Sequence, residues 1–368
     1  MTYLAFHNLW QQKFRLTLSI AGVALAMMLI IILNGFLSGI YVQVTAYLDN
    51  SPADLIVAQD GVTNLVGATS LLPSNTEDEV RSVGGIDQIS PIVAQFVILD
   101  LHNQKVVSYM VGYDLDEGGG PWLLKTGREP ADNDEVVLDW VMAGDHGFEL
   151  GDEINILGAP FTVVGLSEGT NSWMASFFFI EKGAAEQLLL SPGATSFLLL
   201  TVEPGADVEA VEAILDGRLG GVEIVPAETI KQKDIELLVE IFAIPLRIMV
   251  AIAFTVGTAI LGMVIYTATV EREKEYGVLK AVGAKNQQLY WLVAQQGLVT
   301  GLLGVILGIG MAWLAAYWIM NSWSKFLIIF QPITVLSASL TGLLMGLLAA
   351  LLPARKVARL DPAEVFRR

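Results

Sequence analysis

Four long runs without a charged residue dominate the pattern of hydrophobic and polar positions along the chain. A helix needs about 20 apolar residues to cross the hydrocarbon of a membrane, and a charge at its centre costs roughly 2.5–3.5 kcal/mol. Each run is long enough to cross once, so the pattern predicts four membrane-spanning helices. The runs cover residues 16–48, 248–270, 286–324 and 326–354 and contain 33, 23, 39 and 29 residues.

The first run also fits the pattern of a cleaved signal peptide, because Lys13 and Arg15 precede it. Its apolar stretch at 16–37 exceeds the usual length of about 7–15 residues for such peptides, and no A-x-A site follows closely. We therefore predict an uncleaved first span at 16–40 and an N-terminal helix at 1–15.

Between the first two spans the pattern changes to short β-rich runs, turns and helical stretches. Three β-rich runs are separated by glycine-containing turns, which is typical of hairpins, and they lie at 136–138, 153–157 and 161–166. A strand at 196–202, a helix at 207–219 and a strand at 222–225 predict a βαβ unit. We expect an α+β domain of two lobes, of which the second is small and ferredoxin-like in size.

The run WMASFFFI at 173–180 allows two interpretations, an exposed aromatic patch that binds a ligand or a buried strand. The helical stretch at 183–190 follows it directly, and a buried strand that leads into a helix is the more usual arrangement. We interpret the run as a buried strand and place no pocket there.

A helical pattern begins near Ile230 and continues into the second span. Apolar residues recur at steps of three and four, namely Ile235, Leu238, Val239, Phe242 and Leu246. One helix over 230–270 would be roughly 60 Å long, with a kink at Pro245. The alternative is a short surface helix that breaks at Pro245 and is followed by a separate span.

Charge then orients the chain, whose mean hydropathy of +0.57 and 16% charged residues already favour a membrane protein. Residues 41–240 hold 33 acidic residues against 8 Lys/Arg, whereas the short segments 1–15, 271–285 and 353–368 together hold 11 Lys/Arg against 5 acidic residues. Basic short loops face the cytoplasm, while long domains cross regardless of charge. We therefore expect a cell-membrane protein with both termini in the cytoplasm.

This orientation assigns a role to each segment. Residues 41–229 form an extracytoplasmic domain, and residues 230–270 form a stalk helix and the second span. Residues 271–285 form a cytoplasmic coupling helix. The third and fourth spans lie at 286–318 and 332–354, with an outer loop at 319–331 between them and a cytoplasmic tail at 355–368.

The cytoplasmic loop TVEREKEYGVLKAVGAK at 269–285 carries more charge than a membrane anchor needs. Five consecutive charged residues at 271–275 precede an apolar turn that contains Val278, Leu279 and Val282, and Gly283 follows. Mixed charge beside an amphipathic turn is typical of a helix that docks on another protein.

Four segments resemble one family. The segment EREKEYGVLKAVGAK is similar to the coupling segment of FtsX-like permeases, the membrane subunits of MacB-type (type VII) ABC transporters. The N-terminal NLWQQKFRLTLSIAGVAL, the stretch GREPADNDEVVLDWVMAGDHGFELGDEINILGAPFTVVGL and the C-terminal LPARKVARLDPAEVFRR resemble the first span, extracytoplasmic core and ending of that family in the same order.

The resemblance implies an α-helical membrane protein with four transmembrane helices and a large α+β extracytoplasmic domain inserted between the first and second spans. It also implies a homodimer, or a heterodimer with a paralogue, that works with two copies of an ATP-binding subunit and, in some relatives, a membrane-fusion adaptor. The residues implied in ATPase coupling are Glu271, Arg272, Glu275, Gly277, Leu279, Lys280, Val282 and Gly283.

No phosphate-binding G-x-x-x-x-G-K-[ST] motif occurs in the sequence, so we expect ATP and Mg on a separate chain and no enzyme activity here. The three histidines are scattered, and no spacing predicts a metal site or a cofactor. We also expect no catalytic residues and no nucleic-acid partner.

The spans contain no charged residue in their interiors, which favours export by mechanotransmission over passage of a polar substrate through the membrane. For the dimer seam and stalk we select Gly35, Gly39, Leu238, Phe242 and Leu246. One alternative is a haem or lipid exporter with a cleft between the first and second spans of the dimer, lined by Met28, Asn34, Tyr41, Tyr47, Asp49, Glu240 and Met249. Another is a regulator of an extracytoplasmic enzyme that transports nothing.

Overall fold

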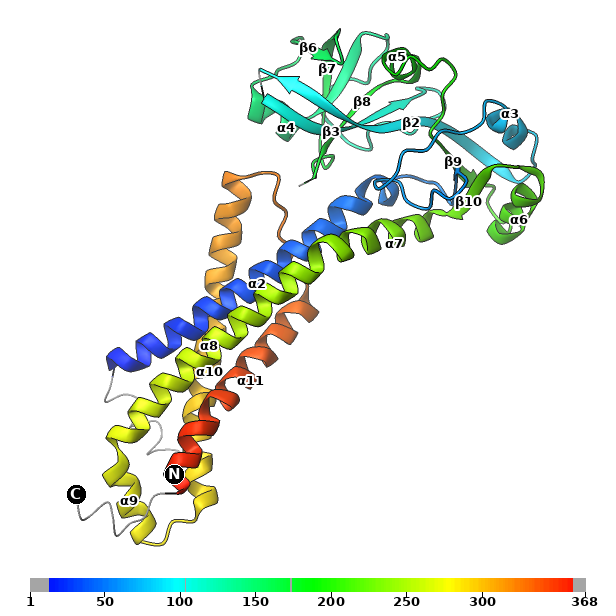
Figure 1. Ribbon diagram of the computed structural model, residues 1–368. Helices are drawn as coiled ribbons and strands as arrows, with labels where there is room; N and C mark the ends of the chain where they lie inside the picture. Colours follow the sequence, from blue (N-terminus) through cyan, green and yellow to red (C-terminus); the bar gives the residue numbers. More distant parts are fainter. Residues whose placement is uncertain (1–12, 103, 173, 360–368) are drawn as a thin grey trace. The chain divides into compact units, whose positions relative to one another are not determined.

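The computed structural model describes residues 13–102, 104–172 and 174–359. Within these ranges, four helices are long and apolar enough to span a membrane, and a large α+β region lies between the first two (Figure 1). This confirms the predicted fold class. The expected N-terminal helix and most of the cytoplasmic tail lie outside the described residues.

The chain divides into two compact units, which we call the helical unit and the sheet unit. Among the described residues, the helical unit comprises 13–39, 242–323 and 328–359, and the sheet unit comprises 40–102, 104–172, 174–241 and 324–327. Two helices, α2 and the helix that contains α7 and α8, have residues in both units. Their bounds are Lys13–Asp49 for α2, Ala227–Leu238 for α7 and Ile244–Glu271 for α8.

In the helical unit, α10 (Asn286–Ser322) packs on α11 (Pro332–Ala358) through glycines. A Cβ on Gly297 would collide with the carbonyl oxygen of Gly346, and one on Gly301 would touch the carbonyl of Gly342. Further along α10, Gly304 and Gly308 lie against Val23 and Met27 of α2. Lipid offers helices no hydrophobic drive to associate, so small residues that allow close backbone contact hold them together.

The first lobe of the sheet unit is ferredoxin-like. Its sheet order is β10-β1-β9-β2, and the helices α3 and α6 connect β1 to β2 and β9 to β10. The elements are β1 (Leu55–Gln59), α3 (Thr76–Arg81), β2 (Ile86–Leu101), β9 (Phe197–Val202), α6 (Val208–Arg218) and β10 (Val222–Pro226). The last three confirm the βαβ unit that the sequence predicts.

The second lobe is inserted between β2 and β9 and continues the same sheet. Strand β2 pairs with β9 in one half of its length and with β3 in the other, so ten strands form one sheet across both lobes. The inserted elements are β3 (Gln104–Tyr113), β4 (Leu124–Gly127), β5 (Glu135–Asp139), α4 (Trp140–His146), β6 (Glu153–Ile156), β7 (Ala159–Ser167), β8 (Ser176–Glu181) and α5 (Lys182–Leu188). Strand β8 is buried along most of its length, as expected for this run.

Both faces of the sheet are covered. On one face, Tyr47 at the end of α2 and Ile230 of α7 pack with Phe177, Phe179 and Phe197 of the strands. On the other face, α3 and α6 cover the ferredoxin-like lobe, while α4 and α5 cover the inserted lobe.

The stalk is helical from Ala227 to Glu271 and contains one irregularity. A π-helical turn at Val239–Ala243 separates α7 from α8, and Pro245 lies in the first turn of α8. Proline has no N–H to donate and its ring crowds the preceding turn, which explains the wider turn just before it. The sequence analysis expected a kink at Pro245, with a break as the alternative. The structure has a π-helical turn directly before this residue, and the helix does not break.

Candidate coupling site

The coupling segment forms a short helix, α9 (Glu273–Ala281), after one non-helical residue, Arg272. Its end is fixed by Gly283, whose φ of 102° lies in the left-handed region that glycine adopts without a steric penalty. The N–H of Gly283 donates to the carbonyl of Lys280 at 3.1 Å, and that of Ala284 donates to the carbonyl of Leu279 at 3.0 Å. These bonds close the helix and turn the chain into α10.

One side of α9 is anchored to α10 and α11. Tyr276 is only 2% exposed and packs with Leu289 and Val357. Its burial raises the pKa of the hydroxyl, and a hydrogen bond with Gln296 opposes that rise. Lys280 Nζ donates to the carbonyl oxygen of Ala358 at 2.7 Å, which ties α9 to the end of α11. The helix is therefore held in place by its inner side.

The opposite side of α9 is exposed, and we call it the docking face. It consists of Lys274, Glu275, Val278, Ala281 and Val282, all exposed to solvent. Val278 is 45% exposed and Val282 is 85% exposed. Two exposed apolar side chains beside charges of both signs form the pattern of a protein-binding surface with an apolar centre and a polar rim.

Comparison with known proteins identifies the family. A model of the MacB-like periplasmic core domain matches residues 16–218, and a model of the FtsX-like permease C-terminal domain matches residues 247–362. The chain belongs to the MacB/FtsX-type ABC transporter permeases. This confirms the resemblance found in the sequence, and it makes the chain a multi-pass membrane protein of a kind that works with an ATP-binding partner.

Individual relatives are distant. An uncharacterised ABC transporter permease of Methanocaldococcus jannaschii is 25% identical, covering 99% of this chain and 96% of its own. A relative from Staphylococcus haemolyticus named as a hemin transport system permease protein is 21% identical, covering 99% of this chain and 98% of its own. A permease of Mycobacterium tuberculosis is 29% identical over 63% of this chain, and the match spans only 29% of that longer protein.

The structure divides the eight expected coupling residues of the permease into two groups. Four are exposed, namely Glu271, Glu275, Val282 and Gly283. The other four are turned at least partly inward, namely Arg272, Gly277, Leu279 and Lys280. The sequence analysis omitted Lys274 from the set, although Lys274, Val278 and Val282 follow one another at four-residue steps and so share a side of the helix.

The residues expected at the dimer seam do not form an exposed surface. Gly35 packs inside its own helical unit, where a Cβ would meet Ile328 and Phe330, and Gly39 is also buried. Leu238 is buried in the sheet unit, while Phe242 and Leu246 are half-buried. Packing within the chain covers Gly35 and Leu238, and their assignment to the dimer seam and stalk stays a prediction.

The residues expected to line a ligand cleft are mostly engaged elsewhere. Tyr47 is buried in the sheet unit, donates to the carbonyl of Gly119 at 2.6 Å and stacks on Phe177. Asp49 pairs with Lys231 at 3.0 Å. Two of the remaining members, Met249 and Glu240, are exposed, and two others, Met28 and Tyr41, are half-buried. The amide of Asn34 donates to the carbonyl of Ile30 in its own helix. Tyr47 is part of a protein core in this chain, and the expected cleft stays a prediction.

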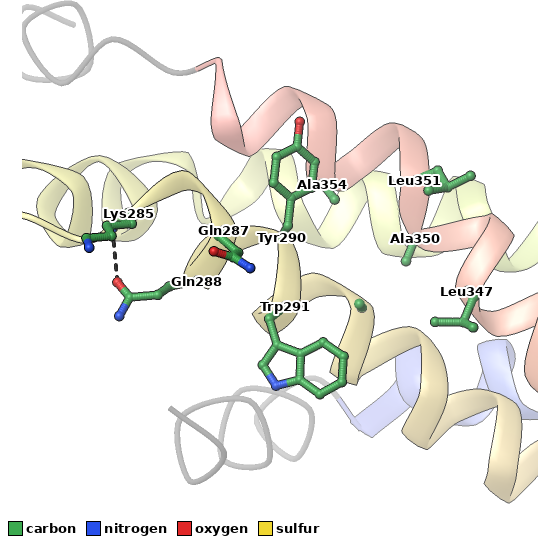
Figure 2. A pocket seen from close by; sticks show the side chains of 10 residues that line it. Lys285, Gln287, Gln288, Tyr290, Trp291, Leu347, Ala350, Leu351 and Ala354 are labelled. Atoms are coloured by element: carbon green, nitrogen blue, oxygen red, sulfur yellow. Dashed lines mark hydrogen bonds between the residues drawn. The ribbon is translucent and has the colours of Figure 1, made fainter.

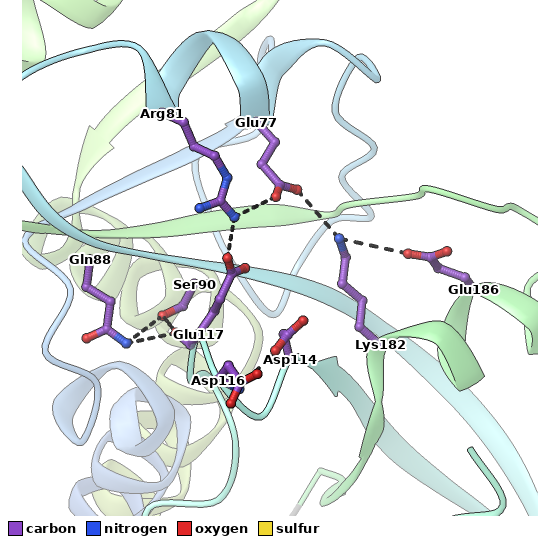
Figure 3. A network of polar contacts seen from close by, with 9 residues as sticks. All are labelled: Glu77, Arg81, Gln88, Ser90, Asp114, Asp116, Glu117, Lys182 and Glu186. Atoms are coloured by element: carbon purple, nitrogen blue, oxygen red, sulfur yellow. Dashed lines mark hydrogen bonds and ion pairs between the residues drawn. The ribbon is translucent and has the colours of Figure 1, made fainter. Parts of the chain in front are cut away.

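A charged cluster in the sheet unit joins the two lobes and needs no ligand to explain it (Figure 3). Arg81 of α3 pairs with Glu77 at 2.8 Å and with Glu117, which follows β3. Lys182 of α5 lies 3.6 Å from Glu77 and 3.8 Å from Glu186. Such partly exposed pairs each contribute about 0–1 kcal/mol. Among the described residues, no group of three or more His, Cys, Asp or Glu is arranged to hold a metal ion.

Proposed function

We propose that the permease couples ATP hydrolysis by a separate subunit to export of an amphipathic substrate, with α9 as the contact. The docking face carries this proposal. It exposes two valines beside Lys274 and Glu275 on a helix whose other side is fixed by Tyr276 and Lys280. A helix held on one side and exposed on the other transmits a push without being displaced from its neighbours.

The polar groups of the spans support mechanotransmission over a polar conduit. The Thr255 hydroxyl donates to the carbonyl of Ala251 at 2.8 Å, and that of Thr258 donates to the carbonyl of Phe254 at 2.7 Å. Asn34 makes the same kind of bond at 2.8 Å. These three side chains each donate to a carbonyl of their own helix, and none of these donors is directed toward a substrate path.

The proposed motion of α9 would pass along the continuous chain through α8 and α7. Only Arg272 separates α9 from α8, and α8 continues through the π-turn into α7, whose residues pack in the core of the sheet unit. On the orientation that the charges favour, motion of the cytoplasmic subunit would reach the extracytoplasmic domain along this helix. We infer that the domain then acts on a substrate outside the membrane or in its outer leaflet, with an adaptor where one exists.

We also propose a homodimer that binds two ATPase subunits. A stripe of exposed β-branched residues follows four-residue steps along α8 and offers a surface for the seam. Its members are Ile244, Ile248, Ile252 and Val256, while Ile260, the next residue in the row, packs against Gly22 of α2. Side chains at four-residue steps form a ridge, and such a ridge can pack into the groove of a facing helix.

The test changes the docking face without changing the core. Val278→Asp together with Val282→Asp places two charges on an exposed apolar centre, so the permease should fold while the ATPase subunit dissociates. Loss of a hot-spot residue costs about 2 kcal/mol or more, and the added charges would be buried unpaired in the contact, so we expect at least about tenfold weaker binding. Co-purification of the ATPase subunit and its ATP turnover give the readout.

Leu190→Asp is the matched control, because Leu190 is 89% exposed in the sheet unit and lies outside α9. The control should retain the ATPase subunit. Unchanged binding and turnover in the α9 double variant would rule out the docking face as the contact.

A further inference from the structure

A groove in the helical unit lies between the start of α10 and the second half of α11 (Figure 2). Its volume is about 760 Å³, within the range of about 300–1,000 Å³ typical of small-ligand sites. It exists because the facing residues are small: Ala294 on one helix and Ala350 and Ala354 on the other. Deeper along the same pair of helices, the contact between Gly297 and Gly346 brings the backbones together.

The lining of the groove changes from apolar to polar along its length. Leu347 and Leu351 line the part nearer the middle of the span, whereas Lys285, Tyr290 and Trp291 line the part at the helix ends. Trp291 is 56% exposed, which suits an indole at the boundary between hydrocarbon and headgroups. An occupant must therefore be an alkyl chain at one end and polar at the other.

One cation, Lys285, lines the polar end, and a second, Arg355, follows on the adjoining helix α11. No described carboxylate is paired with the ammonium of Lys285, and the exposed Arg355 lies one turn beyond Leu351 on the same row of α11. No acidic residue is among those that line the groove. The neighbouring Lys356 is directed elsewhere, because its Nζ lies 3.1 Å from the hydroxyl of Tyr266 on α8. The charge at this end therefore selects an anionic headgroup.

We propose that this groove binds one anionic phospholipid, with an acyl chain along Leu347 and Leu351 and the phosphate between Lys285 and Arg355. The lipid occupies a space that no described side chain fills, and it compensates the two cations at headgroup depth. Lys285 comes directly after the turn at Gly283 and Ala284 that follows α9. A lipid bound there steadies the junction between α9 and α10.

The experiment places the full-length permease in nanodiscs of phosphatidylglycerol or phosphatidylcholine whose acyl chains carry bromine. Bromine quenches a nearby indole, and the difference between the wild type and Trp291→Phe isolates the signal of Trp291. Each brominated lipid is diluted into unlabelled phosphatidylcholine. We expect brominated phosphatidylglycerol to quench Trp291 more strongly than the same fraction of brominated phosphatidylcholine does. Each basic residue contributes about fivefold to such a preference, so Lys285→Gln with Arg355→Gln should largely abolish it.

Lys356→Gln is the matched control, because it removes the same charge one residue away on another side of α11, and it should keep the preference. A groove-filling Ala294→Phe variant should lose the quenching, whereas Leu302→Phe, at an exposed position of the same helix, should not. Equal quenching by both lipids would overturn the proposal in favour of non-selective lipid contact. Absence of quenching by either would mean that protein covers the groove. The readout uses no ATPase subunit, so its failure is independent of the proposed coupling at α9.

Discussion

The two units of the permease reach close packing by opposite means. In the helical unit, glycines and alanines let backbones touch, as at Gly297 and Gly346. In the sheet unit, large aromatic side chains fill the core, as where Phe179 stacks on Phe177 with ring centroids 6.2 Å apart. The difference teaches that the surrounding solvent decides which side chains hold a unit together.

The physical reason lies in the reference state of each side chain. An aromatic residue in the sheet unit leaves water on folding, and its buried area contributes roughly 25 cal/mol per Å². A leucine on a spanning helix leaves lipid, which is as apolar as the protein interior, so burial contributes little. Contact distance then matters more than side-chain size in the helical unit.

The largest effect should come from adding a side chain where two helix backbones touch. Gly297→Leu would force α10 and α11 apart, because even its Cβ collides with the Gly346 backbone and backbone atoms cannot rotate aside. We expect nearly complete loss of monodisperse protein on size-exclusion chromatography. Gly310→Leu is the control on the same helix, since a Cβ there meets nothing within 4 Å. Equal recovery of both variants would show that close backbone contact is not what holds the helical unit together.

A smaller but still large effect should follow from removing an aromatic ring in the sheet unit. Phe179 is fully buried, so Phe179→Ala should lower the free energy of unfolding of this unit by about 3–5 kcal/mol. Amide hydrogen exchange of β3 and β8 in the full-length protein measures the change. Leu190→Ala, at an exposed position, should leave exchange unaltered, and a comparable loss there would argue against burial as the cause.

A still smaller effect concerns Asp139, a buried carboxylate of the sheet unit. Its side chain caps α4 by accepting from the N–H groups of Val141 and Met142, and it also accepts from the Thr170 hydroxyl at 2.8 Å. Burial nevertheless dominates these bonds and raises the pKa to about 6. The folded state therefore holds this proton more tightly than the unfolded chain, whose pKa is about 3.9.

The sign of the pH dependence follows from that difference. The contribution of Asp139 to stability is complete below about pH 4 and is lost as the pH rises through about 6. Asp139→Asn keeps the helix cap and carries no charge, so it should stabilise the sheet unit at pH 7 by about 2 kcal/mol. The same hydrogen-exchange measurement at pH values from 4 to 7 should show that the gain disappears at the acid end. A gain of equal size at every pH would disprove the assignment to this carboxylate.

Much of the coupling site was predictable from the sequence, but its orientation was not. The segment 271–285, its mixed charge and its ending at Gly283 were all evident. The division of its residues into an inner and an outer side depends on Tyr276, which packs on Leu289 of α10 and Val357 of α11. Those partners lie too far along the chain for local spacing to indicate them.

The sequence by itself determined the four spans, the α+β class of the inserted region and the long stalk helix, because each depends on local periodicity and on the absence of charge. Only the tertiary structure decided which neighbours each residue meets. The glycines of α10 and α11 pack within one chain, and Leu238 and Tyr47 belong to the core of the sheet unit. The sequence pattern fixes which side of a helix is apolar, whereas the packing of distant segments decides whether lipid, a second copy or the same chain covers that side.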